Sequence, residues 1–218
     1  MCSQYDPYSS VDELHRLFDL RSAPLKLKKG TVWPTGLAPF IRLAVDGSRE
    51  RVLEEGHFGL LPVFAKEVAF GRKTYNARSE TVHSKPSFRD SWRKGYRCVI
   101  PAECVYEISY ETGKAVRWRI SGGAYSLLRI AGIYSPWTDK DGVVRGTFAM
   151  ITINADGHPV YSRFHAPGDE KRMIVLLEAD EVDPWLTCSP QDAQAFFKQS
   201  TADLLATPSP LLGRRSAG

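Results

Sequence analysis

The sequence has little cysteine, and its cysteines form no recognisable framework. Cys2, Cys98, Cys104 and Cys188 include no C-x-x-C pair and no evenly spaced set. A small secreted domain held by disulfides, or a structural zinc site, would show such spacing. We therefore expect a reduced, intracellular protein that needs no metal, with Cys98, Cys104 and Cys188 buried as packing residues.

Long apolar runs and low-complexity blocks are also missing. No run approaches the roughly 18 residues that a membrane span needs, and the polar, acidic stretch over residues 1–20 excludes a secretory signal. The net charge is +4 and the isoelectric point is about 8.9, which fits a polyanionic partner without requiring one. These features predict a cytoplasmic protein with no membrane contact.

No linker divides the chain. Its 14 prolines and 17 glycines are spread along 218 residues, and no repeat or change of composition marks a boundary. With 43% hydrophobic residues the chain is long enough to bury a sizeable core. We expect one domain over residues 1–212, followed by a frayed tail over residues 213–218.

Short strand-like runs recur along the chain at turn-bounded intervals. They span residues 31–33, 40–45, 52–60, 96–100, 116–120, 126–134, 147–154 and 173–177. Asp46-Gly47 and Asp141-Gly142 are typical of tight hairpin turns. Many short strands favour an α+β fold, mainly antiparallel with a barrel-like core, over a doubly wound sheet.

Few helices are indicated, and we expect them at the periphery. Ser10-x-x-Glu13 is a capping box, and the apolar residues after it share one face of a helix. A second helix is expected to start at Ser189, with Pro190 at its first position. A short helix is also expected over residues 159–163.

Cys2 directly follows the initiator methionine. Methionine aminopeptidases remove Met1 when the next side chain is small, so the mature chain would begin with an amine and a thiol on one residue. The amine condenses with an aldehyde to a Schiff base, and the thiol closes a thiazolidine ring on the same carbon. An α-amine titrates at about 7.7–8 and a free thiol near about 8.5, so both have nucleophilic forms close to neutral pH. On this residue alone, an unanchored terminus without a function remains an alternative.

Three internal segments place polar side chains within strand or turn contexts. Asn76 offers two donors and an acceptor, and Arg78 beside it can reach a phosphate, although a polar loop with a surface arginine also explains both. Alternation puts Glu107 on the same face as Val105, which suits a paired or functional carboxylate; an edge-strand glutamate facing water is the alternative. His165 lies in a loop, where function concentrates, although a lone histidine is more often structural.

Taken together, these segments resemble the SOS response-associated peptidase (SRAP) family, proteins that covalently shield abasic sites in single-stranded DNA. The matching elements follow the family's order over residues 2–177. They are Met1-Cys2, Pro34-Thr35, Gly59-Leu60-Leu61-Pro62, Asn76-Ala77-Arg78-Ser79-Glu80-Thr81, Pro86-Ser87-Phe88-Arg89, Arg97-Cys98-Val99-Ile100-Pro101-Ala102, Tyr106-Glu107, Ala131-Gly132, and His165 with Lys171-Arg172-Met173. Each element alone is weak, whereas their joint order is specific and favours a functional role for Cys2.

The chain departs from the family pattern at several positions. Ser3-Gln4 replaces the usual Gly-Arg, and Phe58 stands where a tryptophan is usual. Cys104 and Ile108 occupy positions where glycine and tryptophan are usual, and residues 166–171 separate the histidine from Arg-Met. Because Phe58 and Ile108 replace two tryptophans, the resemblance implies weaker stacking on DNA bases than in typical members.

The resemblance also implies a reaction and a set of residues. Cys2 would attack the sugar C1′ of an abasic site, giving a Schiff base and then a thiazolidine. Glu107 would shuttle protons during ring opening, His165 would act as general acid/base there and in crosslink reversal, and Asn76 would orient the α-amine. The implied DNA-binding residues are Arg78, Arg89, Arg172 and Pro34, with Arg163 and Lys171 as outlying help. No cofactor would be needed.

The implied partner is single-stranded DNA that contains abasic sites, bound by a monomer of a bacterial or phage-type, nucleoid-associated protein. The family's nominal peptidase activity would be self-processing, the release of residues ahead of Cys2. Two other classes stay open. One is an N-terminal-nucleophile amidohydrolase or cysteine peptidase that uses Cys2 with His165; the other is a non-catalytic single-strand binder that uses residues such as Trp92, Arg93 and Tyr96.

Overall fold

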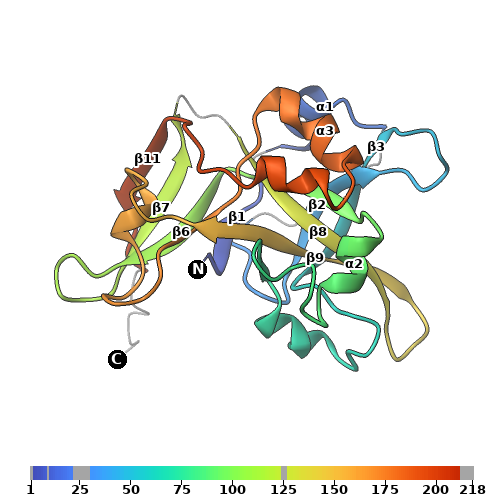
Figure 1. Ribbon diagram of the computed structural model, residues 1–218, viewed down its shortest axis with the longest axis horizontal. Coiled ribbons are helices and arrows are strands. Elements are labelled where there is room, and N and C mark those ends of the chain that lie inside the picture. The colour runs from blue at the N-terminus through green and yellow to red at the C-terminus, as the bar shows by residue number, and fades with distance from the viewer. Residues whose placement is uncertain (1, 9, 22–29, 124–126, 212–218) are drawn as a thin grey trace, which may run out of the picture.

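Two sheets account for most of the structure (Figure 1). The computed structural model describes residues 2–8, 10–21, 30–123 and 127–211, so the tail expected over residues 213–218 lies outside the described residues. The strands are β1 (Gln4–Asp6), β2 (Leu37–Leu43), β3 (Arg51–Phe58), β4 (Asn76–Arg78), β5 (Arg97–Ala102), β6 (Cys104–Ser109), β7 (Val116–Gly122), β8 (Leu128–Thr138), β9 (Val144–Asn154), β10 (Arg172–Ile174) and β11 (Leu204–Pro208).

The helical segments are short. Those in the described residues are α1 (Val11–Phe18), α2 (Arg89–Arg93), α3 (Val182–Thr187), and the 3₁₀ segments η1 (Val68–Lys73), η3 (Tyr161–Arg163), η4 (Ala179–Glu181) and η5 (Asp192–Phe196). In Figure 1, α1 and α3 lie together at the top of the molecule and α2 lies at its right-hand side. No helix within the described ranges is both long and apolar enough to cross a bilayer.

The larger sheet closes into a barrel. Its strands run in the order β9-β3-β2-β5-β8, and β8 pairs again with β9. Within this ring only the β3–β9 pairing is parallel. The short strands β4 and β10 also pair with β9. The expected α+β fold, with a mainly antiparallel, barrel-like core and a few peripheral helices, is confirmed.

Both hairpin turns predicted from the sequence are confirmed. Gly47 joins β2 to β3 with a φ of +82°, and Gly142 joins β8 to β9 with a φ of +79°. Glycine adopts this left-handed conformation without steric cost, so each turn reverses the chain tightly. The two hairpins supply four of the five barrel strands.

A smaller antiparallel sheet, ordered β1-β6-β7-β11, lies beside the barrel, to the left in Figure 1. Buried aromatic rings join it to the barrel. Tyr5 in β1 meets Phe58 in β3 edge to face at 5.1 Å, and Phe58 stacks on Phe148 in β9 at 5.7 Å. Since these three side chains are fully buried, they contribute both hydrophobic burial and oriented ring contacts.

The predicted helix starts were partly right. Ser10 caps α1 by accepting a hydrogen bond from the N–H of Glu13 (3.1 Å), as the capping box indicated. Ser189 caps in the same way, by accepting from the N–H of Asp192 (3.2 Å), but the segment that follows is the 3₁₀ helix η5 and not an α-helix. The helix expected over residues 159–163 is likewise a single 3₁₀ turn.

The expected packing role of the internal cysteines is confirmed for two of them. Cys98 and Cys104 are fully buried, whereas Cys188 is only half-buried, and all are free thiols. Burial raises the pKa of the Cys104 thiol to about 11 and also raises the pKa values of the Cys98 and Cys188 thiols. Neutral, poorly reactive thiols suit packing positions.

We predict that Gly59→Ala destabilises the protein by about 3 kcal/mol. Gly59 has a φ of +132°, and a Cβ there would collide with the backbone of Gly71, so positive-φ strain adds to overpacking. Gly113→Ala is the control, because Gly113 has a φ of +76° but nothing within 4 Å of an added Cβ. Urea unfolding measures both. Equal losses of stability would show that the close approach of the two glycines does not matter.

Candidate functional site

Cys2 is fixed by the strand that follows it. The β1 strand pairs with β6 in the register Gln4↔Tyr106 and Tyr5↔Val105, which brings the start of the chain beside Glu107. Cys2 is 1% exposed, and its Sγ lies 3.4 Å from the carbonyl oxygen of Gln4. The unanchored terminus that the sequence left open is therefore wrong for this residue.

Asn76 holds the backbone of Cys2. It is the first residue of β4, which runs parallel to β9. Its Nδ2 donates to the Cys2 carbonyl oxygen at 2.8 Å. Its Oδ1 is buried and has no hydrogen-bond partner among the described residues. Because buried amide oxygens are normally bonded, this acceptor is available to a donor such as the α-amine of Cys2.

Glu107 and His165 form a buried acid–base pair. The His165 Nε2 lies 3.4 Å from the Glu107 Oε2, and the two side chains are 8% and 4% exposed. This separation is an ion-pair distance, longer than a well-formed hydrogen bond. The alternative of a water-facing edge glutamate is wrong, because β6 lies between β1 and β7 and Glu107 is buried.

The backbone around His165 assigns its tautomer. The N–H of Arg172 donates to the His165 Nδ1 at 3.5 Å, at the long limit for such a bond. An Nδ1 that accepts leaves the proton of a neutral imidazole on Nε2, which faces Glu107. His165 itself has a φ of +70°, and its N–H donates to the Ile108 carbonyl at 2.9 Å. The loop that carries His165 is thus attached to β6 at the residue after Glu107.

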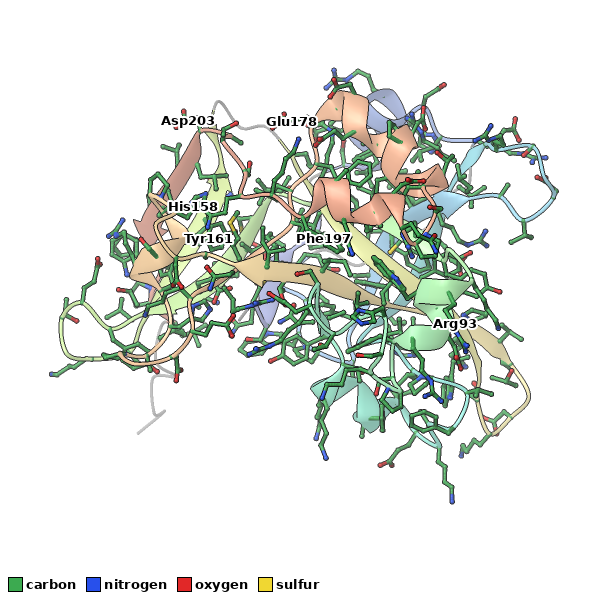
Figure 2. All side chains as sticks on the ribbon, viewed as in Figure 1. Arg93, His158, Tyr161, Glu178, Phe197 and Asp203 are labelled. Atoms are coloured by element: carbon green, nitrogen blue, oxygen red, sulfur yellow. The ribbon has the colours of Figure 1, made fainter. Side chains whose placement is uncertain are left out.

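The thiol of Cys2 is held neutral. Burial is the largest cause of its raised pKa, and the negative charge of Glu107 raises the pKa further. Three tyrosines near it, Tyr5, Tyr75 and Tyr161, also have raised pKa values because they are buried. Figure 2 labels Tyr161 beside His158, and their rings meet edge to face at 5.4 Å. In this environment a thiolate at residue 2 is disfavoured.

A pocket of about 200 Å³ opens onto this pair. Glu107 lines it from β6, His165 from the loop between η3 and β10, and Arg117 from β7. Ala166 and Asp169, from the segment that separates the histidine from Arg-Met, also line it. The pocket therefore combines the Glu107–His165 pair with residues at which this chain departs from the family pattern.

Arg117 is a site residue that the sequence did not reveal. Its NH1 donates to the Gln4 Oε1 at 3.0 Å, and its guanidinium lies 4.1 Å from the centre of the Tyr106 ring. Gln4 stands where the resembled family commonly has arginine. Arg117 in β7 therefore supplies a cation beside a position that lacks the usual one. No local sequence motif predicts the contact between Arg117 and Gln4, because it depends on which strands pair.

Arg78 and Arg172 are occupied by carboxylates. Arg172 is 1% exposed, and its NH1 bonds to Glu80 and Glu170 at 2.7 Å each. Its NH2 donates to the Thr152 carbonyl oxygen at 2.7 Å. Arg78 NH1 bonds to the other oxygen of Glu170 at 2.8 Å. Of these two predicted phosphate contacts, only Arg78 reaches the surface.

The remaining predicted DNA-binding residues are more accessible. Arg89 lies at the start of α2 with half of its side chain exposed, and Arg163 forms two 3.0 Å bonds to Glu111 while lying over the Trp118 ring. Pro34 is half-buried beside Trp33, which is 47% exposed. The structure leaves these three on the surface and outside the pocket lining.

The expectation that the side chain at position 58 stacks on DNA bases is wrong. The Phe58 ring is fully buried between Tyr5, Tyr75 and Phe148, so it cannot stack on a base. Trp92, considered for a non-catalytic binder, is also buried, at 4% exposure. Ile108 is half-buried at the pocket. The large aromatic side chains that do reach solvent include Trp33 and Phe64.

The described part of the chain contains no ligand set for a metal centre. No group of three or more histidine, cysteine, aspartate or glutamate side chains is arranged there to hold a metal ion.

Comparisons with known proteins show the family to which the chain belongs. A family model described as SOS response associated peptidase (SRAP) matches residues 1–209. The abasic site processing protein YoaM of Bacillus subtilis is 31% identical over 205 residues, which cover 92% of this chain and 84% of YoaM. The abasic site processing protein HMCES of Gallus gallus is 30% identical over 166 residues, 64% of this chain and 46% of HMCES. A crystal structure of a Bordetella bronchiseptica protein has a TM-score of 0.87 and 32% identity, covering 96% of this chain and 100% of its own.

Arg172→Met is expected to lower the free energy of unfolding by about 2–3 kcal/mol. Breaking one side of a buried ion pair costs about 3–5 kcal/mol, but Glu80 and Glu170 are 49% and 40% exposed and regain water. The control is Arg93→Met, whose 71% exposed side chain pairs with Asp90 on the surface and should change stability by at most about 0.5 kcal/mol. Urea unfolding compares the two. A loss at Arg172 no larger than at Arg93 would contradict the structural role.

Proposed function

Because the chain belongs to the SOS response associated peptidase (SRAP) family, we propose that it processes abasic sites in single-stranded DNA by covalent attachment through Cys2. The observation that carries the proposal is the juxtaposition of Cys2 with an acid–base pair. Cys2 is buried, Asn76 binds its carbonyl oxygen, and Glu107 and His165 line the adjoining pocket. An internal cysteine would lack the amine that this chemistry needs.

The substrate reacts only in its open form. An abasic deoxyribose exists as a closed hemiacetal and as an aldehyde, and only the aldehyde condenses with an amine. Glu107 and His165 move the protons of ring opening, since their side chains adjoin and line the same pocket. The pocket, at about 200 Å³, is smaller than the roughly 300–1,000 Å³ of drug-sized sites. It suits a sugar that has lost its base.

Bond formation follows in two steps. After removal of Met1, the amine of Cys2 attacks C1′, water leaves, and a Schiff base forms. The thiol then adds to the same carbon, its proton passes to the nitrogen, and a thiazolidine closes. The Asn76 Oδ1 orients the amine by accepting a hydrogen bond from one of its N–H groups. The raised pKa of the thiol supports this order, with amine attack first and sulfur addition second.

The same residues support the remaining activities of the proposal. Reversal of the crosslink uses the His165 proton in the opposite direction, as microscopic reversibility requires. Self-processing, the release of residues ahead of Cys2, would generate the amine, and this is the sense in which we use the peptidase label. The amidohydrolase alternative would need donors aimed at a developing oxyanion, and the neutral Cys2 thiol beside a carboxylate does not favour it.

DNA binding is proposed to rest on surface cations and exposed rings. Arg78, Arg89 and Arg163 would contact phosphates, and Arg117 would face the strand at the pocket. Arg172 is proposed to position Glu170 and Glu80 and does not contact DNA in this arrangement. A protein of this kind would act where DNA is, in the cytoplasm of a bacterial cell.

The test of the function is a crosslinking gel with single-stranded DNA that carries one abasic site. Wild type is expected to give a heat-stable adduct. Cys2→Ala should give none while still binding undamaged single strands, and Cys2→Ser should give only a Schiff base that needs reduction to be trapped. Cys188→Ala controls for the loss of a thiol outside the site and should behave as wild type. A stable adduct in Cys2→Ala would refute the assignment.

Glu170→Gln should strengthen binding to undamaged single strands. The Glu170 carboxylate bridges Arg78 and Arg172, where a phosphate would bind Arg78, so removing its charge frees a cation. One additional phosphate contact should steepen the salt dependence, log K against log salt, by roughly 0.7. Salt titrations measure this.

Glu50→Gln is the matched control, because it removes one charge from a surface pair with Arg21. If Glu170→Gln and Glu50→Gln bind alike at every salt concentration, Glu170 does not compete with a phosphate.

A further inference from the structure

The segment that follows His165 returns to its starting point. His165 is bonded to Ile108 in β6. The chain then runs through residues 166–171 and returns to His165 at Arg172, whose N–H donates to the His165 Nδ1. The two ends of this small loop thus meet at the imidazole. Residues 166–171 also form the departure that separates this chain from the family pattern, so the loop is a property of this chain.

His165 is held in an unfavourable conformation. Its φ of +70° is in the left-handed region, which costs a residue with a Cβ roughly 1–2 kcal/mol. Such a conformation persists only where the surroundings impose it. One restraint is the bond from its N–H to the Ile108 carbonyl at 2.9 Å. A second restraint has to fix the carbonyl side of the residue.

Lys171 provides that second restraint. Its Nζ lies 2.9 Å from the Phe164 carbonyl oxygen, 3.4 Å from that of His165 and 3.3 Å from that of Ala166. Three consecutive carbonyls therefore converge on one ammonium group, which has three donors. Lys171 is half-buried, so these charge-assisted bonds are partly shielded from water.

We infer that Lys171 is a positioning residue for His165. By binding the carbonyls before, at and after the histidine, it fixes the peptide planes on both sides of the left-handed residue. That keeps the Nε2 at 3.4 Å from Glu107 and the Nδ1 within reach of the Arg172 N–H. Lys171 touches no substrate in this scheme. The inference rests on the proposed function, because it concerns the general acid/base of that reaction.

A clamp that merely stabilises the loop would bind the same three carbonyls. The two roles differ in how they combine with loss of the imidazole. A positioning residue acts through His165, so its removal has no consequence once the imidazole is gone. A structural clamp would disturb the pocket whether or not the imidazole is present.

The experiment is a double-mutant cycle on crosslink formation with saturating abasic single-stranded DNA. Lys171→Met is expected to slow the reaction by roughly 10- to 100-fold, the scale of a displaced catalytic group, with an unchanged half-saturating DNA concentration. In the His165→Ala background the same substitution should change the rate by less than twofold. Lys171→Arg, which keeps cationic donors, should recover most of the rate. Lys198→Met, which removes an exposed lysine paired with Glu181, controls for charge and should match wild type.

Each outcome decides the matter. The inference is overturned if Lys171→Met crosslinks as fast as Lys198→Met, or if it slows the reaction equally with and without the imidazole. Should Lys171→Met fail to fold, the cycle is run with Lys171→Arg, whose smaller slowing must also vanish in the His165→Ala background. Absence of any adduct with wild type would refute the proposed function instead, so the two failures are distinguishable.

Discussion

The pairing of β1 with β6 is the interaction on which the rest of the site depends. It involves three residue pairs, yet it places the start of the chain against the strand that carries Glu107. Tyr5 strengthens it on two sides, since its backbone bridges to Val32 and its ring packs on Phe58 in the barrel. Chain termini are usually the least ordered part of a domain. Here Cys2 and Tyr5, near the start of the chain, are buried in the core, and the barrel supports them rigidly.

The strands and turns could be read from the sequence because they follow local rules. Hairpin turns need a glycine at a positive φ, and barrel strands need apolar residues over short runs, so both leave signals within a few neighbouring positions. The short strands β1, β4 and β11 leave no such signal. They are three, three and five residues long, and β4 forms where it can pair with β9. The α-helix expected at Ser189 failed for a related reason: the cap is local, but the continuation into η5 is set by packing.

The site was predictable to the extent that family motifs mark it. The pattern pointed to Cys2, Asn76, Glu107 and His165, and the structure gathers the first two by a hydrogen bond and the last two by an ion pair. Their chemical roles remain proposals. Arg172 shows the limit of prediction from motifs, because the sequence around an arginine does not reveal whether it binds a phosphate or a carboxylate. Burial and partners decide between the two, and both depend on contacts across about 90 residues of sequence, as the Arg172–Glu80 bond does. Arg117 was missed, and Lys171 was expected near phosphates only, because their partners are strand neighbours and backbone carbonyls, which no side-chain pattern encodes.

The burial of Cys2 has a consequence for how long the protein stays competent. Cellular peroxides oxidise the thiolate form of cysteine and react in proportion to its exposure. A thiol that is 1% exposed and whose pKa is raised presents almost no thiolate to such oxidants. Burial therefore acts as chemical preservation: it keeps the Cys2 thiol reduced, which the covalent chemistry proposed for this residue requires.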